Sequence, residues 1–362
     1  MECETVIRPT AIDLFCGAGG LTLGLKQAGF AVLGGVEVEA IPANTFRINH
    51  PNVYCFEEDI RTLGAVALMR KLGLRPGDLD LLAGCPPCQG FSTLRTRKKA
   101  LAVNDYRNDL LFEFLRFVEA LWPKTIMMEN VPALAQDKRI SQFLRRLNQL
   151  GYRVGRRTIS VENAADYGVP QRRRRMILLA SRTGKIVRPE HSEHISVRKA
   201  LEAVKLEPMG SSGDPLHDFM PKRAPHVEEI IRHIPHDGGS RTSLPDHLVL
   251  KCHQNHAGGF RDVYGRMAWD QVSPTMTGGC GNPSKGRYLH PDENRSITLR
   301  EAAIFQTFPI DYKFDLSKGR SRVALMIGNA LPPEFIRRHA VEIMKSLGGV
   351  TTDYESKQQQ LN

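Results

Sequence analysis

The sequence predicts an α/β protein with a doubly wound, Rossmann-like domain and a smaller domain rich in loops. Over roughly the first 180 residues, short apolar runs of strand length alternate with helical patterns. From residue 186 to about 290 this periodicity is weak, prolines and glycines are frequent, and ten of the twelve histidines lie there. Strands that alternate with helices favour a parallel sheet covered by helices on both faces.

The elements follow from the apolar runs and from the glycines and prolines between them. Gly29 closes the first helical pattern, and Pro42 lies near the first turn of the second. Strands are predicted at residues 11–15, 31–36, 53–56, 79–83, 125–128 and 176–180. Helices are predicted at residues 21–28, 42–49, 110–121, 298–306 and 333–347.

Composition narrows the class of protein. The chain has 362 residues, with 50 Lys and Arg against 39 Asp and Glu, a net charge of +11. This charge favours a polyanionic partner such as nucleic acid, although an evenly scattered basic surface has the same net charge. No apolar run approaches the roughly 20 residues of a membrane span, and the start has no signal-peptide core. Seven cysteines, an odd count, argue against a disulfide framework, so we expect a cytosolic protein, or a nuclear one in a eukaryote.

Glycines and polar residues gather where the predicted strands end. Ligands of doubly wound sheets bind beyond the carboxyl ends of the strands, so one crevice can collect these segments. They are the loop DLFCGAGG at residues 13–20, Glu37, Asp59, CPPCQ at residues 85–89, and ENV at residues 129–131.

The glycine loop favours a nucleoside ligand. Glycines allow close approach of the backbone, and the helix N-terminus beyond them carries partial positive charge. Glu37, 20 residues after Gly17, can bind ribose hydroxyls. Thr22 stands where the dinucleotide fingerprint has its third glycine, which favours a nucleoside without phosphates, such as S-adenosylmethionine, over NAD. A tight turn without a ligand is the alternative.

Cys88 is the candidate nucleophile. Two prolines restrict the backbone before it, and basic residues that follow, including Arg95 and Arg97, favour the thiolate that a nucleophile requires. Cys85 and Cys88 also form a C-x-x-C pair, which leaves redox and zinc interpretations open. A zinc site needs two further ligands, and no other cysteines or histidines have the standard spacing, so we expect no metal.

An acidic residue and a run of arginines complete the candidate site. A carboxyl group at Glu129 can hold the ring nitrogen and the exocyclic amine of a base; a helix cap or a surface charge is the alternative. In QRRRR at residues 171–175, Arg173 and Arg175 share one face of an extended chain. Such a run is usually solvated, but its fusion to a predicted buried strand favours a function.

Together these segments resemble the DNA cytosine-5 methyltransferase family, in its compact bacterial modification form, and they follow that family's order. The loop at residues 13–20 resembles its cofactor loop, PCQGFS at residues 87–92 its nucleophile motif, and ENV and QRRRR its base-holding motifs. REAA and QTFP within residues 300–309 and GNALPP at residues 328–333 resemble its last two motifs, and PTMT at residues 274–277 resembles a domain boundary.

The resemblance implies a reaction. A methyl group is transferred from S-adenosylmethionine to C5 of a cytosine that is flipped out of a specific double-stranded DNA sequence. Cys88 is expected to attack C6 of the base and Glu129 to hold its N3 and 4-amino groups. Arg173 and Arg175 are expected to face the base and the nucleophile, with Arg173 the first choice.

Further residues are carried over by position. Val38 departs from the pattern, because some members place an aromatic residue there to stack on adenine. The expected cofactor-binding residues are Phe15, Gly17, Gly19, Glu37, Val38, Asp59, Ile60, Leu110 and Asn329. The expected DNA-binding residues are Gln89, Ser92, Arg95, Arg97 and Thr275, and residues 92–105 are expected to close over DNA.

The resemblance also implies domains and partners. A catalytic S-adenosylmethionine-binding domain is expected at residues 1–185 and 326–350, a target recognition domain at residues 186–325, and a flexible tail at residues 351–362. We expect a cytoplasmic, nucleoid-associated monomer whose partner is double-stranded DNA, with a cognate restriction endonuclease as a further candidate partner.

Two rival functions share the same chemistry or fold. An RNA cytosine-5 methyltransferase is the first, disfavoured because the Cys-Phe-Thr tripeptide of the tRNA-directed branch is absent from this sequence. A catalytically inactive DNA-binding homologue is the second, disfavoured because Cys88, Glu129 and Arg173 are all present. The DNA sequence that is recognised does not follow from the protein sequence.

Overall fold

The chain forms two compact units. The computed structural model describes residues 8–87, 110–219, 221–254 and 262–349. The first unit comprises Met1–Asn163, Arg174–His191 and Leu331–Asn362, and the second comprises Ala164–Arg173 and Ser192–Ala330. Residues 164–173 and 326–330 therefore belong to the second unit, although they lie within the ranges predicted for the catalytic domain.

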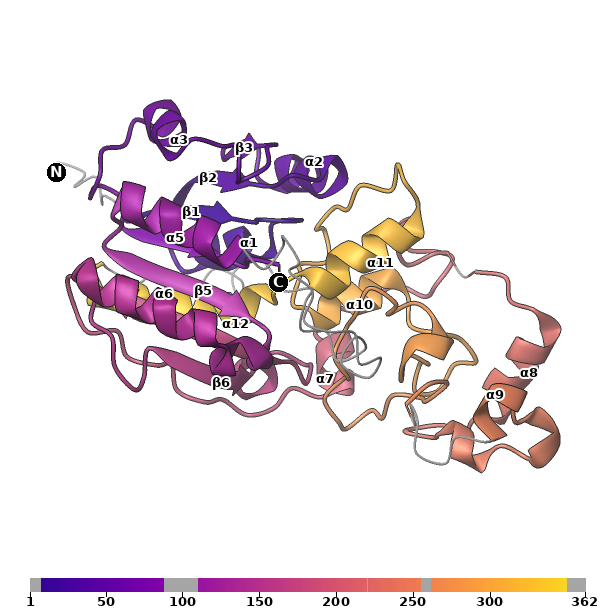
Figure 1. The fold of residues 1–362 in the computed structure, drawn as a ribbon. Coiled ribbons are helices and arrows are strands. Elements are labelled where there is room, and N and C mark those ends of the chain that lie inside the picture. Colours follow the sequence, from indigo (N-terminus) through magenta and orange to yellow (C-terminus); the bar gives the residue numbers. More distant parts are fainter. Residues whose placement is uncertain (1–7, 88–109, 220, 255–261, 350–362) are drawn as a thin grey trace, which may run out of the picture. The chain divides into compact units, whose positions relative to one another are not determined.

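A seven-stranded sheet forms the centre of the first unit, in the order β3-β2-β1-β4-β5-β7-β6 (Figure 1). The first five strands pair in parallel, so their carboxyl ends share one edge of the sheet. The predicted Rossmann-like α/β class is confirmed. The strands are β1 (Thr10–Leu14), β2 (Ala31–Val36), β3 (Tyr54–Phe56), β4 (Leu81–Gly84), β5 (Thr125–Asn130), β6 (Ile159–Asn163) and β7 (Arg174–Ser181).

The far edge of the sheet differs from the prediction of a parallel sheet. β7 runs antiparallel to both β5 and β6. The connection from β6 to β7 is too short for the crossover helix that parallel pairing requires, so the chain reverses direction. β6 itself was not predicted, because its residues ISVEN contain no apolar run and lie partly exposed at the edge of the sheet.

Helices cover the sheet. α3 (Ala65–Leu72), α5 (Leu110–Leu121) and α6 (Lys138–Gln149) share one cluster of buried side chains with the strands. Phe114, Phe117 and Phe143 are fully buried there, and each such side chain stabilises the fold by roughly 1.5–3 kcal/mol. Figure 1 shows α5 and α6 lying along the sheet, with α12 (Pro333–Ser346) behind it.

The last helix, α12, returns to the first unit and packs against α1 (Gly20–Gln27). The closest approach is at Gly24, where a Cβ atom would lie 2.5 Å from the carbonyl oxygen of Pro333 and 2.6 Å from Cβ of Ile336. Gly24 is therefore required for this packing, because any larger side chain would force the two helices apart. α2 (Ala40–Asn49) follows β2.

The second unit consists of short helices joined by long loops, in keeping with the weak periodicity of its sequence. Ile230, Ile231 and Ile234, within and just after α8, form a small core with residues of the following loops. Its α-helices are α7 (Val197–Glu202), α8 (Pro225–His233), α9 (Lys251–Gln254), α10 (Leu299–Phe305) and α11 (Arg320–Asn329). Within the described ranges, none of the helices is both long and apolar enough to span a membrane.

Candidate active site

The glycine loop after β1 has backbone angles that favour glycine, and it is hydrogen bonded to the side chain of Glu37. Phe15, Gly17 and Gly19 have φ angles of 64°, 54° and 92°, in the left-handed region that favours glycine. The amide of Gly17 donates to Oε2 of Glu37 at 2.9 Å, and the amide of Glu39 donates to Oε1 at 2.8 Å. Burial raises the pKa of Glu37. The glycine loop and Glu37, which the sequence predicted to share one crevice, therefore lie together in the first unit.

The other expected cofactor residues lie at the same edge of the sheet or in the second unit. Asp59 is paired with Arg61, at 2.9 Å from Nε to Oδ1, and this hydrogen bond lowers the pKa of Asp59. Ile60 is buried, Leu110 begins α5, and Val38 is 60% exposed. Asn329 is exposed at the end of α11, in the second unit.

Asp13 is a site residue that the sequence reasoning did not single out. Its carboxyl group is fully buried; Oδ2 accepts a hydrogen bond from the hydroxyl of Thr22 at 2.7 Å, and Oδ1 has no hydrogen-bond partner among the described residues. Burial raises the pKa of Asp13 to about 7. The sequence did contain a signal that could have pointed to Asp13. Thr22, which stands where the dinucleotide fingerprint has a glycine, is the residue that donates to its carboxyl group.

Glu129 lies at the end of β5 and is paired with Arg175 of β7, at 2.7 Å from Oε1 to Nε. The thiol of Cys85 donates a hydrogen bond to the same carboxylate; burial, followed by the charge of Glu129, raises the pKa of Cys85 well above its ordinary value. Arg175 and Glu129, both predicted site residues, therefore lie together. Cys85 lies beside them, although the sequence suggested for it only a redox or zinc-binding role.

Asn130 ties the end of β5 to the segment that leads to Cys88. Its side-chain amide donates to the carbonyl oxygen of Pro86 at 2.9 Å, and its side-chain oxygen accepts from the amide of Val131 at 2.8 Å. These contacts fix the backbone two residues before Cys88. Outside the described residues lie the candidate nucleophile and four expected DNA-binding residues: Cys88, Gln89, Ser92, Arg95 and Arg97.

Arg173 makes different contacts from Arg175. Arg173 is 2% exposed and belongs to the second unit, where its two terminal nitrogens donate to the carbonyl oxygens of Met276 at 3.0 Å and of Gly328 at 3.1 Å. Arg172 and Arg174 are exposed, in keeping with the predicted alternation. In the same unit, the hydroxyl of Thr275 donates to the carbonyl oxygen of Arg172 at 2.5 Å.

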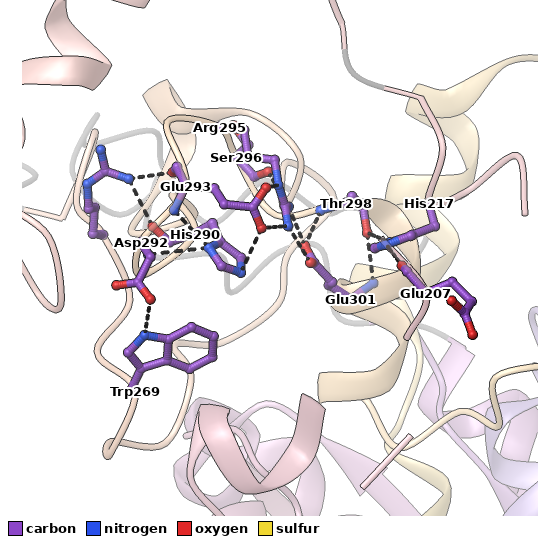
Figure 2. Close-up of polar contacts among 11 residues, drawn as sticks. Glu207, His217, Trp269, His290, Asp292, Glu293, Arg295, Ser296, Thr298 and Glu301 are labelled. Carbon is purple, nitrogen blue, oxygen red and sulfur yellow. Dashed lines mark hydrogen bonds and ion pairs between the residues drawn. The ribbon is translucent and has the colours of Figure 1, made fainter. Parts of the chain in front are cut away.

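A buried network of charges organises the second unit (Figure 2). The guanidinium of Arg295 donates to both oxygens of Glu301 at 2.8 Å and to both oxygens of Glu293 at 2.8 Å. Burial alone would raise the pKa of Glu301, but its hydrogen bonds and charge pairing with Arg295 outweigh burial and lower it. Glu301 also caps α10 by accepting the amide of Thr298 at 2.7 Å, and His217 is hydrogen bonded to the hydroxyl of Thr298 at 3.0 Å.

Comparison with known proteins identifies the family. The model of the family described as C-5 cytosine-specific DNA methylase matches residues 10–345. Type II methylase M.HgiDII of Herpetosiphon aurantiacus is 36% identical, over 94% of this chain and 96% of that protein. Type II methyltransferase M1.HphI of Haemophilus parahaemolyticus is 34% identical, over 93% and 87%. The solved structure of the Entamoeba histolytica methyltransferase EhMeth has the same fold, with a TM-score of 0.66 at 15% identity over 94% of this chain and 99% of that chain. The family predicted from the order of the motifs is therefore confirmed: the chain belongs to the C-5 cytosine-specific DNA methylases and is a DNA (cytosine-5)-methyltransferase.

Proposed function

We propose that this enzyme transfers a methyl group from S-adenosylmethionine to C5 of a cytosine flipped out of double-stranded DNA, through a covalent bond between Cys88 and C6. The observation that carries the proposal is the Glu129–Arg175 pair, 2.7 Å apart at the end of β5, with Asn130 holding the segment before Cys88. The proposal is supported by a buried acid, a cation and the backbone just before the proposed nucleophile, which come from three neighbouring segments of the first unit.

The carboxyl group of Glu129 is suited to bind a cytosine base. Glu129 as a residue is 7% exposed, and hydrogen bonds are stronger where water is excluded. Glu129 would accept a hydrogen bond from the 4-amino group and share a proton with N3 of the base, while Arg175 keeps the carboxyl group in position. Cys88 then bonds to C6, the electron pair of the C5–C6 double bond moves to C5 and, through C4, to N3, and a proton passed from Glu129 to N3 would neutralise the negative charge that develops there. After methyl transfer, the C5 proton leaves and the Cys88–C6 bond breaks.

The first unit fits the proposed cofactor. A glycine loop with positive φ angles lies beside Glu37, a suitable partner for ribose hydroxyls. Asp13 next to that loop has a buried carboxyl oxygen without a hydrogen-bond partner among the described residues, and a buried acid favours a cationic ligand. When bound, S-adenosylmethionine supplies an electrophilic methyl group on a positively charged sulfur.

Arg173 has a positioning role in this proposal. Its guanidinium is engaged by the carbonyl groups of Met276 and Gly328, so Arg175 replaces it as the first choice for the arginine that acts on Glu129. Asn329, the residue after Gly328, stays in the proposed cofactor set through the family motif. Residues 1–185 and 326–350 remain the proposed catalytic domain, and residues 186–325 the proposed target recognition domain.

Double-stranded DNA is the proposed substrate, in keeping with the net charge of +11. The type II relatives favour the modification role in a restriction–modification system, with a cognate endonuclease as functional partner and a monomer as the active form. The modification role rests on the similarity to the type II enzymes M.HgiDII and M1.HphI.

Methyl transfer from tritiated S-adenosylmethionine tests the reaction. We expect label in double-stranded DNA and none in tRNA, and label in tRNA alone would contradict the DNA assignment. Cys88→Ser should abolish transfer but not DNA binding, while Cys252→Ser, at an exposed cysteine, should leave transfer unchanged. Duplex DNA with 5-fluorocytosine at the target should trap a covalent complex, because fluorine does not leave as the proton does; failure to trap would refute the adduct.

A further inference from the structure

A basic surface covers the end of α6 and the loop that follows it. Residues 138–157 contain seven Lys and Arg and no Asp or Glu, although the whole chain has 50 basic against 39 acidic residues. The apolar side chains of α6, Ile140, Phe143 and Leu147, are buried in the core of the first unit, so the arginines of the helix lie on its exposed face. We define the basic surface by five exposed arginines: Arg145, Arg146, Arg153, Arg156 and Arg157.

Four of these five arginines have no acidic partner in the part of the chain that the structure describes. Arg146 pairs with Glu119 of α5 at 2.6 Å, at the surface of the first unit. The other four side chains make neither an ion pair nor a hydrogen bond with any described residue. Like charges gathered without counter-charges repel one another and attract a polyanion. The basic surface is therefore electrostatically complementary to a polyanionic partner.

The loop of the basic surface lies at the amino end of β5, whereas Glu129 lies at the carboxyl end. The hydroxyl of Tyr152 donates to the carbonyl oxygen of Pro123, two residues before β5, at 2.6 Å. The amide of Arg153 donates to the carbonyl oxygen of Ser181, which pairs with the first residue of β5. β5 has six residues, so its two ends lie roughly 17 Å apart. The basic surface is therefore separate from the proposed base-binding site.

The side chains of the basic surface suit the phosphates of a nucleic acid duplex. All five are arginines, whose planar guanidinium groups bind phosphate oxygens through two parallel hydrogen bonds. A membrane is disfavoured, because the apolar side chains of α6 are buried in the core and cannot enter a bilayer. A single strand is disfavoured, because its bases stack on exposed aromatic rings, and the aromatic residues of this segment, Phe143 and Tyr152, are buried.

We propose that the basic surface is a second binding surface for double-stranded DNA, which holds a segment remote from the target cytosine and keeps the enzyme on long DNA. The choice of DNA and the coupling to methylation rest on the proposed function. Contacts to phosphate carry no sequence information, so the segment held here can have any sequence. Binding of this segment raises the effective concentration of the rest of the same molecule at the proposed active site. Long DNA is therefore the better substrate.

The salt dependence of binding tests the surface without the reaction. The full chain with Arg156→Gln and Arg157→Gln loses two exposed charges, and fluorescence anisotropy measures its affinity for a duplex without a target cytosine. Each lost phosphate contact lowers the slope of log affinity against log salt by about 0.9, so the slope should be shallower by about 1.8. The control with Arg70→Gln and Lys71→Gln removes two exposed charges from α3 of the same unit and should keep the original slope. An unchanged slope in the first variant, or an equal change in both, overturns the proposal.

Methylation of two lengths of DNA tests the coupling. One substrate is a duplex just long enough to cover the target, and the other carries the same target within kilobase-length DNA. In the variant with Arg156→Gln and Arg157→Gln, KM for the long DNA should rise by about tenfold, while KM for the short duplex and kcat on both should not change. An equal rise of KM on both substrates would assign these arginines to the target duplex and overturn the proposal of a second surface.

Two further outcomes are informative. Vesicles of equal parts phosphatidylcholine and phosphatidylserine, and single-stranded DNA, serve as other anionic probes. If the loss of the two arginines weakens binding to either probe more than binding to duplex DNA, the proposed partner is wrong. A wild-type enzyme that methylates neither substrate refutes the proposed function, while the salt dependence still decides whether a duplex binds at the basic surface.

Discussion

The guanidinium of Arg175 lies 2.7 Å from the carboxylate of Glu129, and the two side chains come from antiparallel strands β7 and β5. Both are well buried, with 18% and 9% of their side chains exposed. Charge pairs in such surroundings are screened far less than pairs at the surface, so this contact fixes the acid in one orientation. Arg175, rather than Arg173, is the arginine through which the site can act on Glu129.

Removing either partner of this pair is expected to slow catalysis. Glu129→Gln should lower kcat by about 10²–10³-fold, because an amide cannot pass a proton to N3 of the base as negative charge develops there. Arg175→Ala should also lower kcat, because Glu129 loses the guanidinium that holds its carboxyl group in position. Tritium transfer at saturating DNA and cofactor measures both. Arg174→Ala, at an exposed neighbour, is the matched control, and an unchanged kcat in Arg175→Ala would contradict the assignment.

Arg173→Ala is expected to act on stability. The substitution removes two hydrogen bonds from a charged group to the carbonyl oxygens of Met276 and Gly328 and should lower the free energy of unfolding by about 2–4 kcal/mol. Denaturant unfolding measures it, with Arg172→Ala at the exposed neighbour expected to change stability by no more than about 0.5 kcal/mol. A loss of kcat at full stability would return Arg173 to a catalytic role.

Asp13 is expected to make stability fall as the pH rises towards neutrality. Its pKa is raised to about 7 by burial, whereas an aspartic acid in the unfolded chain titrates near 3.9. The folded state therefore keeps a proton that the unfolded chain loses, so the stabilisation is complete below about pH 4 and is lost between there and about pH 7. In Asp13→Asn, unfolding free energies measured across this window should fall less steeply. Asp246→Asn, at an exposed aspartate, should keep the original slope.

Glu162 is expected to contribute in the opposite direction. It is bonded to the fully buried His339 of α12 at 2.7 Å and to Arg188 at 3.1 Å. Burial alone would raise its pKa, but the hydrogen bond and charge of His339, with Ser160 and Arg188, lower it to about 2. The stabilisation is therefore present above about pH 4.3 and is lost as the pH falls towards 2.

The variant Glu162→Gln tests this contribution. It should cost up to about 3 kcal/mol of unfolding free energy at neutral pH, the equivalent of the pKa shift, and the loss should shrink as the pH approaches 2. Urea unfolding at several pH values measures it. Glu190→Gln removes an exposed glutamate of the same unit and should have little effect; equal losses in both variants would contradict the role of the pair.

The Arg295–Glu301 pair is expected to be essential to the second unit. Glu301→Ala leaves a buried guanidinium without its main partner and should lower the unfolding free energy by about 3–5 kcal/mol. Glu293 bonds to the same guanidinium, but its side chain is 53% exposed, so Glu293→Ala should cost less than about 1 kcal/mol. Thermal unfolding of the two variants compares them, and similar midpoints would show that burial does not decide the strength of the pair.

The sequence by itself determined the parallel strands, the segments at their ends and the family. Apolar runs bounded by glycine locate buried strands because each strand must bury its side chains, and parallel pairing brings residues such as Gly17 and Glu37 to one edge. The order of the motifs then narrowed the chemistry to cytosine-5 methylation.

Only the tertiary structure decided which side chains touch. Alternation along a strand places Arg173 and Arg175 on one face, but it does not say that one pairs with Glu129 while the other binds the carbonyl groups of Met276 and Gly328. The direction of β7 and the pairing of Asp13 with Thr22 likewise depend on strand register and on packing between residues far apart in the chain. Such contacts are not encoded in local sequence patterns, because each depends on the position of a second segment.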